Sequence, residues 1–131
     1  MKIGVITDCF KLPLKDGMKL AGELGFDGIQ IYATTGEFSP QTLTDSLKDE
    51  YKKLLKENSL EISALCGDMG GYGFQIAEDN PERIEKTKQI IDLAVEFGVK
   101  VISSWKLLWG KGRLILKNIF RRCVSQGLKD T

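Results

Sequence analysis

The chain has 131 residues, of which 42% are hydrophobic and 28% charged, and its formal net charge is +1. This length allows one domain, the composition is typical of a globular rather than a disordered protein, and the charge excludes a global attraction to nucleic acid or anionic membranes. No apolar run reaches the ~18 residues of a membrane span, and the N-terminus lacks the apolar core of a signal peptide, so we expect a cytoplasmic protein. The cysteines Cys9, Cys66 and Cys123 have no metal-type spacing and are expected to be reduced thiols.

Short apolar segments alternate with helical patterns as far as residue 104. Strands are expected at about 2–7, 28–32, 61–66 and 100–103, and helices at about 14–24, 42–57 and 80–97. Thr44 or Thr42 is expected to cap the second helix, and Asn80 followed by Pro81 is expected to cap and start the third. The inward-facing residues of the three helices are expected to be Leu14, Met18, Ala21 and Leu24; Leu43, Leu47, Tyr51, Leu54 and Leu55; and Ile84, Ile91, Ala94 and Val95.

A local pattern recurs three times, in segments that each join a helix end to a short strand through a small turn residue. These segments are Glu23–Ile31, Glu57–Ser63 and Glu96–Ile102, and their spacing of 34 and 39 residues is the size of a βα unit. Gly25 and Gly98 suit the left-handed conformation that ends a helix. Such a series predicts parallel strands with right-handed crossovers, in either an open doubly wound sheet or an arc of a barrel.

The last 27 residues differ from the rest of the chain. Residues 1–104 carry 12 basic and 17 acidic side chains, whereas residues 105–131 carry 7 basic and 1 acidic. This basic tail is expected to contain one helix at about 114–124, and it is either a natural terminal helix or a segment from another reading frame or a joined fragment. The tail would cover a sheet edge, remain disordered or hold single-stranded nucleic acid. We do not expect nucleic-acid binding, because the tail offers only one short cluster of basic and aromatic residues. The cluster consists of Trp105, Trp109, Lys111, Arg113, Arg121 and Arg122.

Four segments carry a family resemblance that extends over about residues 1–104. They are Met1–Asp8 (MKIGVITD), Leu24–Tyr32 (LGFDGIQIY), Glu61–Met69 (EISALCGDM) and Asn80–Ser103. Together they resemble the sugar phosphate isomerases/epimerases of the xylose-isomerase-like TIM-barrel superfamily. The resemblance implies an α/β fold in which 1–104 forms the N-terminal half of a (β/α)₈ TIM barrel, with about four strands, followed by a C-terminal helix. A complete barrel needs ~250 residues.

The resemblance also implies a reaction, the metal-dependent isomerisation or epimerisation of a sugar or sugar phosphate. A divalent metal such as Mn, Mg, Zn or Co is then held by Glu, Asp and His at the ends of the later strands, and a carboxylate moves the proton. This chain has no histidine and no counterpart of those strands. We therefore expect a truncated protein with no catalytic residue, metal ligand or cofactor of its own, inactive alone and self-associating through exposed barrel edges. The alternative is a non-catalytic sugar-binding or interaction module, and whether the chain is an enzyme stays open.

Substrate-binding candidates follow from the rule that the active face of a barrel lies at the C-terminal ends of its strands. Asp8, after the first strand, would accept a substrate hydroxyl or cap the following loop. Gln30 and Tyr32 share one face of the second strand, where Gln30 would contact substrate or make a structural hydrogen bond; many relatives carry Glu there. Asp68 is the best polar candidate in the glycine-rich loop after the third strand, a lid or rim with only weak phosphate-site character. Cys66 is expected to be a small core residue rather than a nucleophile.

Overall fold

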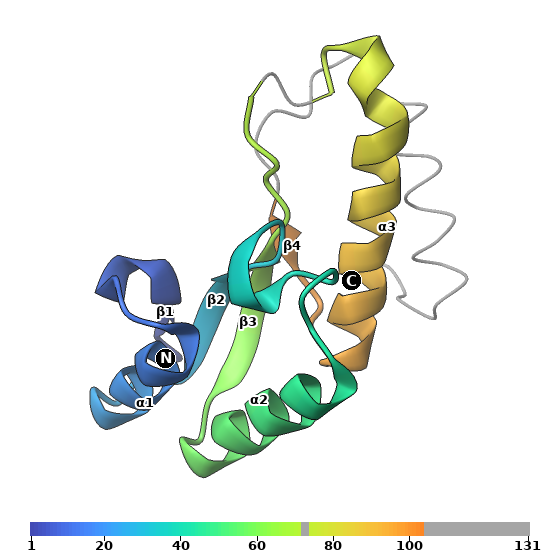
Figure 1. Ribbon diagram of the computed structural model, residues 1–131. Helices are drawn as coiled ribbons and strands as arrows, with labels where there is room; N and C mark the ends of the chain where they lie inside the picture. Colours follow the sequence, from blue (N-terminus) through green and yellow to red (C-terminus); the bar gives the residue numbers. More distant parts are fainter. Residues whose placement is uncertain (72–73, 104–131) are drawn as a thin grey trace.

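Four strands and three α-helices alternate along residues 1–71 and 74–103, which are the residues that the computed structural model describes (Figure 1). Short 3₁₀ turns precede two of the helices and follow the first strand. The predicted tail and its helix lie outside the described residues. The elements are β1 (Gly4–Ile6), η1 (Thr7–Phe10), α1 (Leu14–Glu23), β2 (Gly28–Tyr32), η2 (Gly36–Phe38), α2 (Asp45–Glu57), β3 (Glu61–Cys66), η3 (Ala77–Asp79), α3 (Asn80–Glu96) and β4 (Ile102–Ser103).

The order of the strands decides between the two architectures that the sequence left open. The sheet is parallel throughout and runs β1-β2-β3-β4, so each strand pairs with the next one in the chain. A doubly wound sheet reverses its strand order at a switch point, whereas a barrel adds every new strand to the same edge. The described residues therefore form an arc of a (β/α) barrel.

All three α-helices end in the same way, as the repeated pattern predicted. Gly25, Ser59 and Gly98 have φ values of 79°, 54° and 68°, in the left-handed region. The residue after each of them donates its amide to a carbonyl five residues back: Phe26 to Ala21, Leu60 to Leu55 and Val99 to Ala94. This is the Schellman ending, which turns the chain directly from a helix into the next strand. The repeat in the sequence thus corresponds to one αβ corner built three times.

The predicted cap residue is right for α2 and wrong for α3. Thr44 is the N-cap of α2, and its hydroxyl accepts a hydrogen bond from the Leu47 amide at 3.3 Å. Asn80, the predicted cap of α3, is instead the first residue of the helix. Asp79 holds the cap position with φ −82° and ψ −16° and makes no side-chain cap bond. The reason is that η3 runs straight into α3, which leaves no extended residue from which a side chain can reach back.

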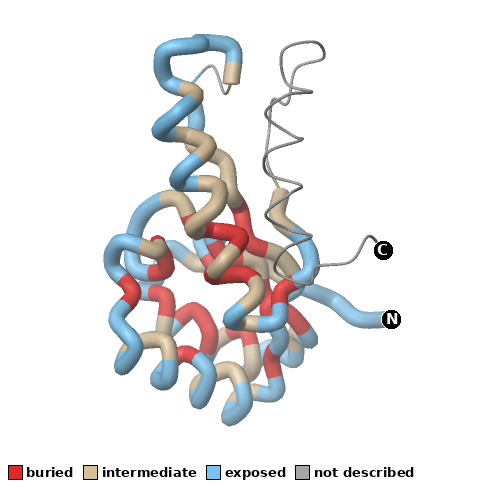
Figure 2. Tube along the Cα trace, turned by 90° about the vertical axis from the view of Figure 1, so that its right-hand side faces the viewer, coloured by how far each residue is buried: buried red, intermediate tan, exposed pale blue. Residues whose placement is uncertain are grey.

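The hydrophobic core lies between the helices and one face of the sheet. Ile29, Ile31 and Leu65 point to this face and are at most 2% exposed. Figure 2 shows that the buried residues gather in this layer, while the first turns of α3 rise above it with no buried residue before Ile90. Of the inward residues predicted for α3, Ile91 and Ala94 are buried, whereas Ile84 and Val95 are half-buried. The core cluster consists of Leu14, Met18, Ala21, Ile29, Ile31, Ala33, Phe38, Leu43, Tyr51, Leu60, Ile62, Leu65, Ile90, Leu93, Ala94 and Val99.

The opposite face of the sheet, which would line the inside of a barrel, is concave and open in the described residues. Gln30 of β2 donates its side-chain amide to the Ser103 hydroxyl of β4 at 3.0 Å, across the intervening β3. In a flat sheet, two strands that are separated by a third lie ~9.5 Å apart. Because the side chains of Gln30 and Ser103 meet across β3, the sheet curves toward this face. Ile6, Tyr32 and Val101 are 38%, 39% and 53% exposed here. We call this surface the inner face.

Candidate ligand-binding site

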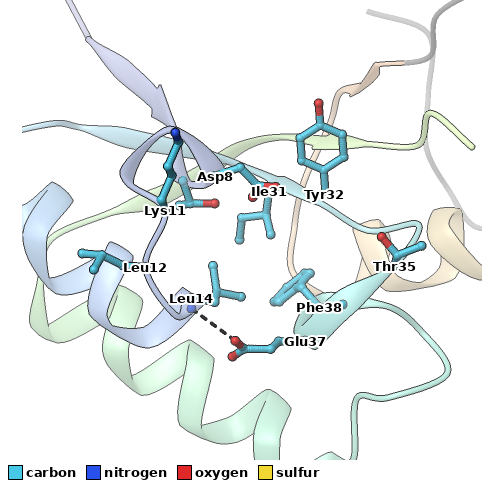
Figure 3. A pocket seen from close by; sticks show the side chains of 11 residues that line it. Asp8, Lys11, Leu12, Leu14, Ile31, Tyr32, Thr35, Glu37 and Phe38 are labelled. Carbon is cyan, nitrogen blue, oxygen red and sulfur yellow. Dashed lines mark hydrogen bonds between the residues drawn. The ribbon is translucent and has the colours of Figure 1, made fainter. Parts of the chain in front are cut away.

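A cleft of about 470 Å³ lies at the C-terminal ends of β1 and β2 (Figure 3). Specific ligand pockets have volumes of roughly 300–1,000 Å³, so this cleft has room for a small molecule. Its floor is apolar because Leu14, Ile31 and Phe38 reach it from the core. Its polar groups come from two loops that follow the strands. They are Thr7, Asp8, Lys11, Thr35 and Glu37.

Asp8 and Lys11 belong to the 3₁₀ turn η1 that follows β1. The Lys11 amide donates to the Asp8 carbonyl at 3.1 Å, and Lys11 ends the turn with φ 53° in the left-handed region. The Asp8 carboxylate makes no hydrogen bond to residues 1–71 and 74–103, so within them it caps no helix. Neither side chain forms an ion pair with the described residues. Both remain able to bind a ligand in the cleft.

Glu37 forms the wall of the cleft between α1 and α2. Its carboxylate accepts hydrogen bonds from the Leu14 amide at 3.5 Å and from the Tyr51 hydroxyl at 3.3 Å. The first bond satisfies a free amide at the start of α1, as a capping group does. Burial, followed by the charge of Glu37, raises the pKa of Tyr51 to about 12. Glu37 thus fixes the loop after β2 to both helices.

A second cleft, of about 340 Å³, lies next to the first at the ends of β2 and β3. Asp68 borders this cleft, and its carboxylate accepts a hydrogen bond from the Gly70 amide at 2.9 Å. This bond closes a turn that fixes the Asp68 side chain at the start of the glycine-rich loop. Arg83 of α3 donates to the Gly70 carbonyl at 3.3 Å and holds the same loop from the other side. Lys86 completes the lining, and its ammonium group is 2.6 Å from Glu82.

Tyr32 stands between the two clefts and lines both. In Figure 3 its ring rises from the end of β2, and its hydroxyl points away from Glu37 and Phe38. The charge of the neighbouring Cys66 raises the pKa of Tyr32, with smaller contributions from burial, a hydrogen bond to Cys66, and the charges of Asp8 and Asp68. The structure therefore brings three of the four predicted residues, Asp8, Tyr32 and Asp68, to one rim.

Gln30, the fourth predicted residue, lies lower on the inner face and lines neither cleft. Its amide makes the hydrogen bond to Ser103, which is the structural role that the sequence left open. Cys66 is 2% exposed and is a small buried residue, as predicted, in register with Tyr32 and Ser103 of the neighbouring strands.

Sequence reasoning missed several residues of the rim. Thr35 and Glu37 follow a strand end directly within a loop containing Gly36 and Pro40, and the rule that located Asp8 and Asp68 applies to them equally. Lys86 gave no such signal, since it lies among the charged residues of α3. The missed residues are Lys11, Thr34, Thr35, Glu37 and Lys86.

The rim does not fit a divalent metal ion. Among residues 1–71 and 74–103 no group of three His, Cys, Asp or Glu side chains is placed to hold one. Asp8 and Asp68 border different clefts, and the chain has no histidine. We therefore derive no chemical step through a metal. In the same part of the chain, no helix combines the length and apolarity needed to cross a membrane.

Fold and rim together define the class of the protein: parallel βα units of a TIM barrel with clefts at the C-terminal ends of the strands. Residues 18–118 match the family described as "Xylose isomerase-like TIM barrel", and the chain belongs to this family. None of the curated proteins compared with the chain matches it.

Solved structures similar to this chain are TIM-barrel proteins about twice as long. The probable 3-DHS dehydratase AsbF from Bacillus anthracis, involved in petrobactin synthesis, is 22% identical with a TM-score of 0.67, covering 97% of this chain and 48% of that one. A xylose isomerase-like TIM barrel protein from Mycobacterium smegmatis, in complex with magnesium, is 17% identical with a TM-score of 0.66, covering 98% and 53%. A sugar phosphate isomerase/epimerase from Parabacteroides distasonis is 19% identical with a TM-score of 0.58, covering 95% and 46%. The chain thus spans about half the length of these structures, and the likeness concerns the fold.

Proposed function

We propose that this chain is the substrate-binding half of a sugar isomerase/epimerase-type barrel and that it binds a polyhydroxylated ligand at its rim without converting it. The observation that carries this proposal is the cleft of about 470 Å³ that Asp8, Lys11 and Thr35 line around an apolar floor. Carboxylates accept hydrogen bonds from sugar hydroxyls, while ammonium and hydroxyl groups donate to sugar oxygens. An apolar floor with a few convergent polar groups is the usual construction of a small-molecule site.

The chemistry of the rim supports binding without turnover. Moving a hydrogen next to a carbonyl requires a base and a group that stabilises the charge developing on the carbonyl oxygen. Asp8 and Asp68 supply carboxylates, but residues 1–71 and 74–103 place no group of donors in their clefts that fits a metal ion. Family members such as the Parabacteroides distasonis protein are described as isomerases/epimerases, and that reaction is proposed here only for a barrel completed by further strands.

Binding and turnover are tested together. The chain is titrated calorimetrically with a panel of pentuloses, hexuloses and their phosphates, with and without Mg²⁺ or Mn²⁺, and the same mixtures are assayed by NMR for new sugars. We expect saturable binding in the millimolar range, as for a shallow site, and no conversion. Conversion above the protein-free blank would overturn inactivity, and the lack of any binding would overturn the proposed site.

We also propose that the chain self-associates through its inner face. Ile6 and Val101 are exposed there, and β1 and β4 are the outermost strands of the four-stranded sheet. Exposed apolar surface beside outer strands promotes pairing between copies. Sedimentation velocity should show a mass that rises with concentration in the wild type and less so in Val101→Lys. Leu24→Lys, at an apolar residue 60% exposed near the end of α1, is the matched control and should behave like the wild type. A wild-type chain that stays monomeric at every concentration contradicts this proposal.

The alternative function, a sugar-binding or interaction module that needs no second half, makes the same binding prediction. The two differ when a polypeptide carrying the later strands of a relative is added. A half-enzyme should form a stable complex with it, whereas a self-sufficient module should bind sugar equally well in its absence and form no complex.

A further inference from the structure

The two clefts adjoin at Tyr32 and Thr35, which line both, along the C-terminal ends of β1, β2 and β3. We call the two adjoining clefts together the rim groove. Tyr32 is its central residue, and an aromatic side chain that is 39% exposed offers one of the largest apolar surfaces there. Asp8 lies on one side of Tyr32 and Asp68 on the other.

The charges of the rim groove are mainly negative. Its carboxylates are Asp8, Glu37 and Asp68, and its cations are Lys11 and Lys86. Lys86 is already engaged by Glu82 at 2.6 Å, which leaves Lys11 as the cation without an ion pair among the described residues. Both Asp8 and Asp68 are close enough to Tyr32 to contribute to its raised pKa, after the larger effect of Cys66. A ligand lying over Tyr32 therefore meets carboxylates on both sides.

We infer that the rim groove selects an uncharged sugar or polyol over the corresponding sugar phosphate, with Tyr32 as the packing surface and Asp8 and Asp68 as hydroxyl acceptors. The inference rests on the proposed function and names the substrate class of that site. The C–H face of a sugar packs well on an aromatic ring, and its hydroxyls donate to carboxylates in charge-assisted bonds. A phosphate dianion gains from Lys11 alone and is repelled by three carboxylates. Asp8 and Asp68 are thus the specificity-determining residues, and Tyr32 supplies packing affinity.

The test compares D-fructose with D-fructose 1-phosphate, a pair that keeps the 6-hydroxyl free to close the same pyranose ring and differs in the phosphate on O1. Calorimetric titrations are run on the wild type, Tyr32→Ala, Tyr32→Phe and the double variant Asp8→Asn/Asp68→Asn, with Leu24→Ala as a control far from the groove. We expect the wild type to bind fructose more tightly than its phosphate. Tyr32→Ala should weaken fructose binding by about tenfold, the scale of one aromatic contact, whereas Tyr32→Phe and Leu24→Ala should bind like the wild type.

The double variant tests the role of charge. Removing both carboxylates while keeping their shape should weaken fructose binding and strengthen binding of the phosphate, so that the preference narrows or reverses. The inference is overturned if the wild type binds the sugar phosphate more tightly than fructose, and if that affinity is lost in Lys11→Ala but kept in Tyr32→Ala. This outcome leaves the proposed function intact. Failure of both ligands to bind overturns the proposed function as well. Circular dichroism of each variant confirms that a loss of binding is not a loss of fold.

Discussion

The two faces of the sheet are made from the same strands, yet they have opposite characters. On the helix-covered face Ile29 and Leu65 have no exposed surface, whereas on the inner face Ile6 and Val101 are 38% and 53% exposed. A parallel barrel strand normally buries both of its faces, one under helices and one in the barrel interior. Among the described residues the first kind of burial is complete at Ile29 and Leu65 of the two central strands, whereas the inner face keeps Ile6 and Val101 exposed. Stability should therefore depend on the helix-covered face, and binding and association on the inner face and the rim above it.

The largest expected effect is the difference in the free energy of unfolding when the same Ile→Ala substitution is made on each face of the sheet. Ile29→Ala removes a fully buried side chain and should lower the free energy of unfolding by about 2–5 kcal/mol. Ile6→Ala on the inner face should lower it by less than ~1 kcal/mol. Urea unfolding followed by circular dichroism measures both. Equal losses would show that the inner face is as buried as the outer one and would break the comparison.

A smaller effect is expected where two helices of the covered layer meet. A Cβ atom added at Gly22 of α1 would lie 2.8 Å from Asn58 Cβ and 3.1 Å from the Asn58 carbonyl oxygen, which follows α2. Gly22→Ala should therefore cost about 1–3 kcal/mol through overpacking. Gly17→Ala in the same helix is the control, since its nearest neighbour is 3.7 Å away, and it should gain ~0.5–1 kcal/mol from helix propensity. A stabilising Gly22→Ala would mean that α1 and α2 pack less closely than described.

The smallest effect concerns Tyr51, which links the covered layer to the cleft through Glu37. Its pKa is raised to about 12 in the folded chain, above the ordinary ~10, so folding favours the neutral phenol. The stability that this shift contributes is fully present below pH ~10 and is lost as the pH rises toward the pKa of the folded chain. At pH ~11 the loss amounts to roughly 1 kcal/mol. Tyr51→Phe should lose less stability than the wild type between pH ~9 and ~11. Identical pH profiles in urea titrations would contradict the buried position of the hydroxyl.

Local signals in the sequence predicted most of the fold. The bounds of β2 and β3 match their predictions, and the three αβ corners follow from Gly25, Gly98 and the equivalent Ser59. These features depend on neighbours in the chain, which the sequence displays directly. The cap residue of α3 was wrong because η3 continues into the helix. The choice of barrel over doubly wound sheet needed the strand order, which depends on contacts between distant segments.

The lining of the candidate site was predicted in part, and the difference between residues is instructive. Asp8, Tyr32 and Asp68 follow directly from the rule that strand ends carry the functional groups. The same rule placed Gln30 at the rim too. Gln30 precedes Tyr32 by two residues in β2, and from there its side chain bonds to Ser103 instead of lining a cleft. Lys86 arrives from a helix of the third unit, and only the folded arrangement brings it beside Tyr32.

The most direct test of the account is to locate the ligand on the folded chain. An amide-resolved NMR titration with a neutral ketose should shift the signals of residues 7–12, 32–37 and 68–71, at the ends of β1, β2 and β3. The amides of the helix-covered core, such as Ala21 and Ile90, should not move. Saturable shifts confined to the helical side, or no saturable shift at any residue, would contradict the claim that the rim of this half-barrel is a ligand-binding site.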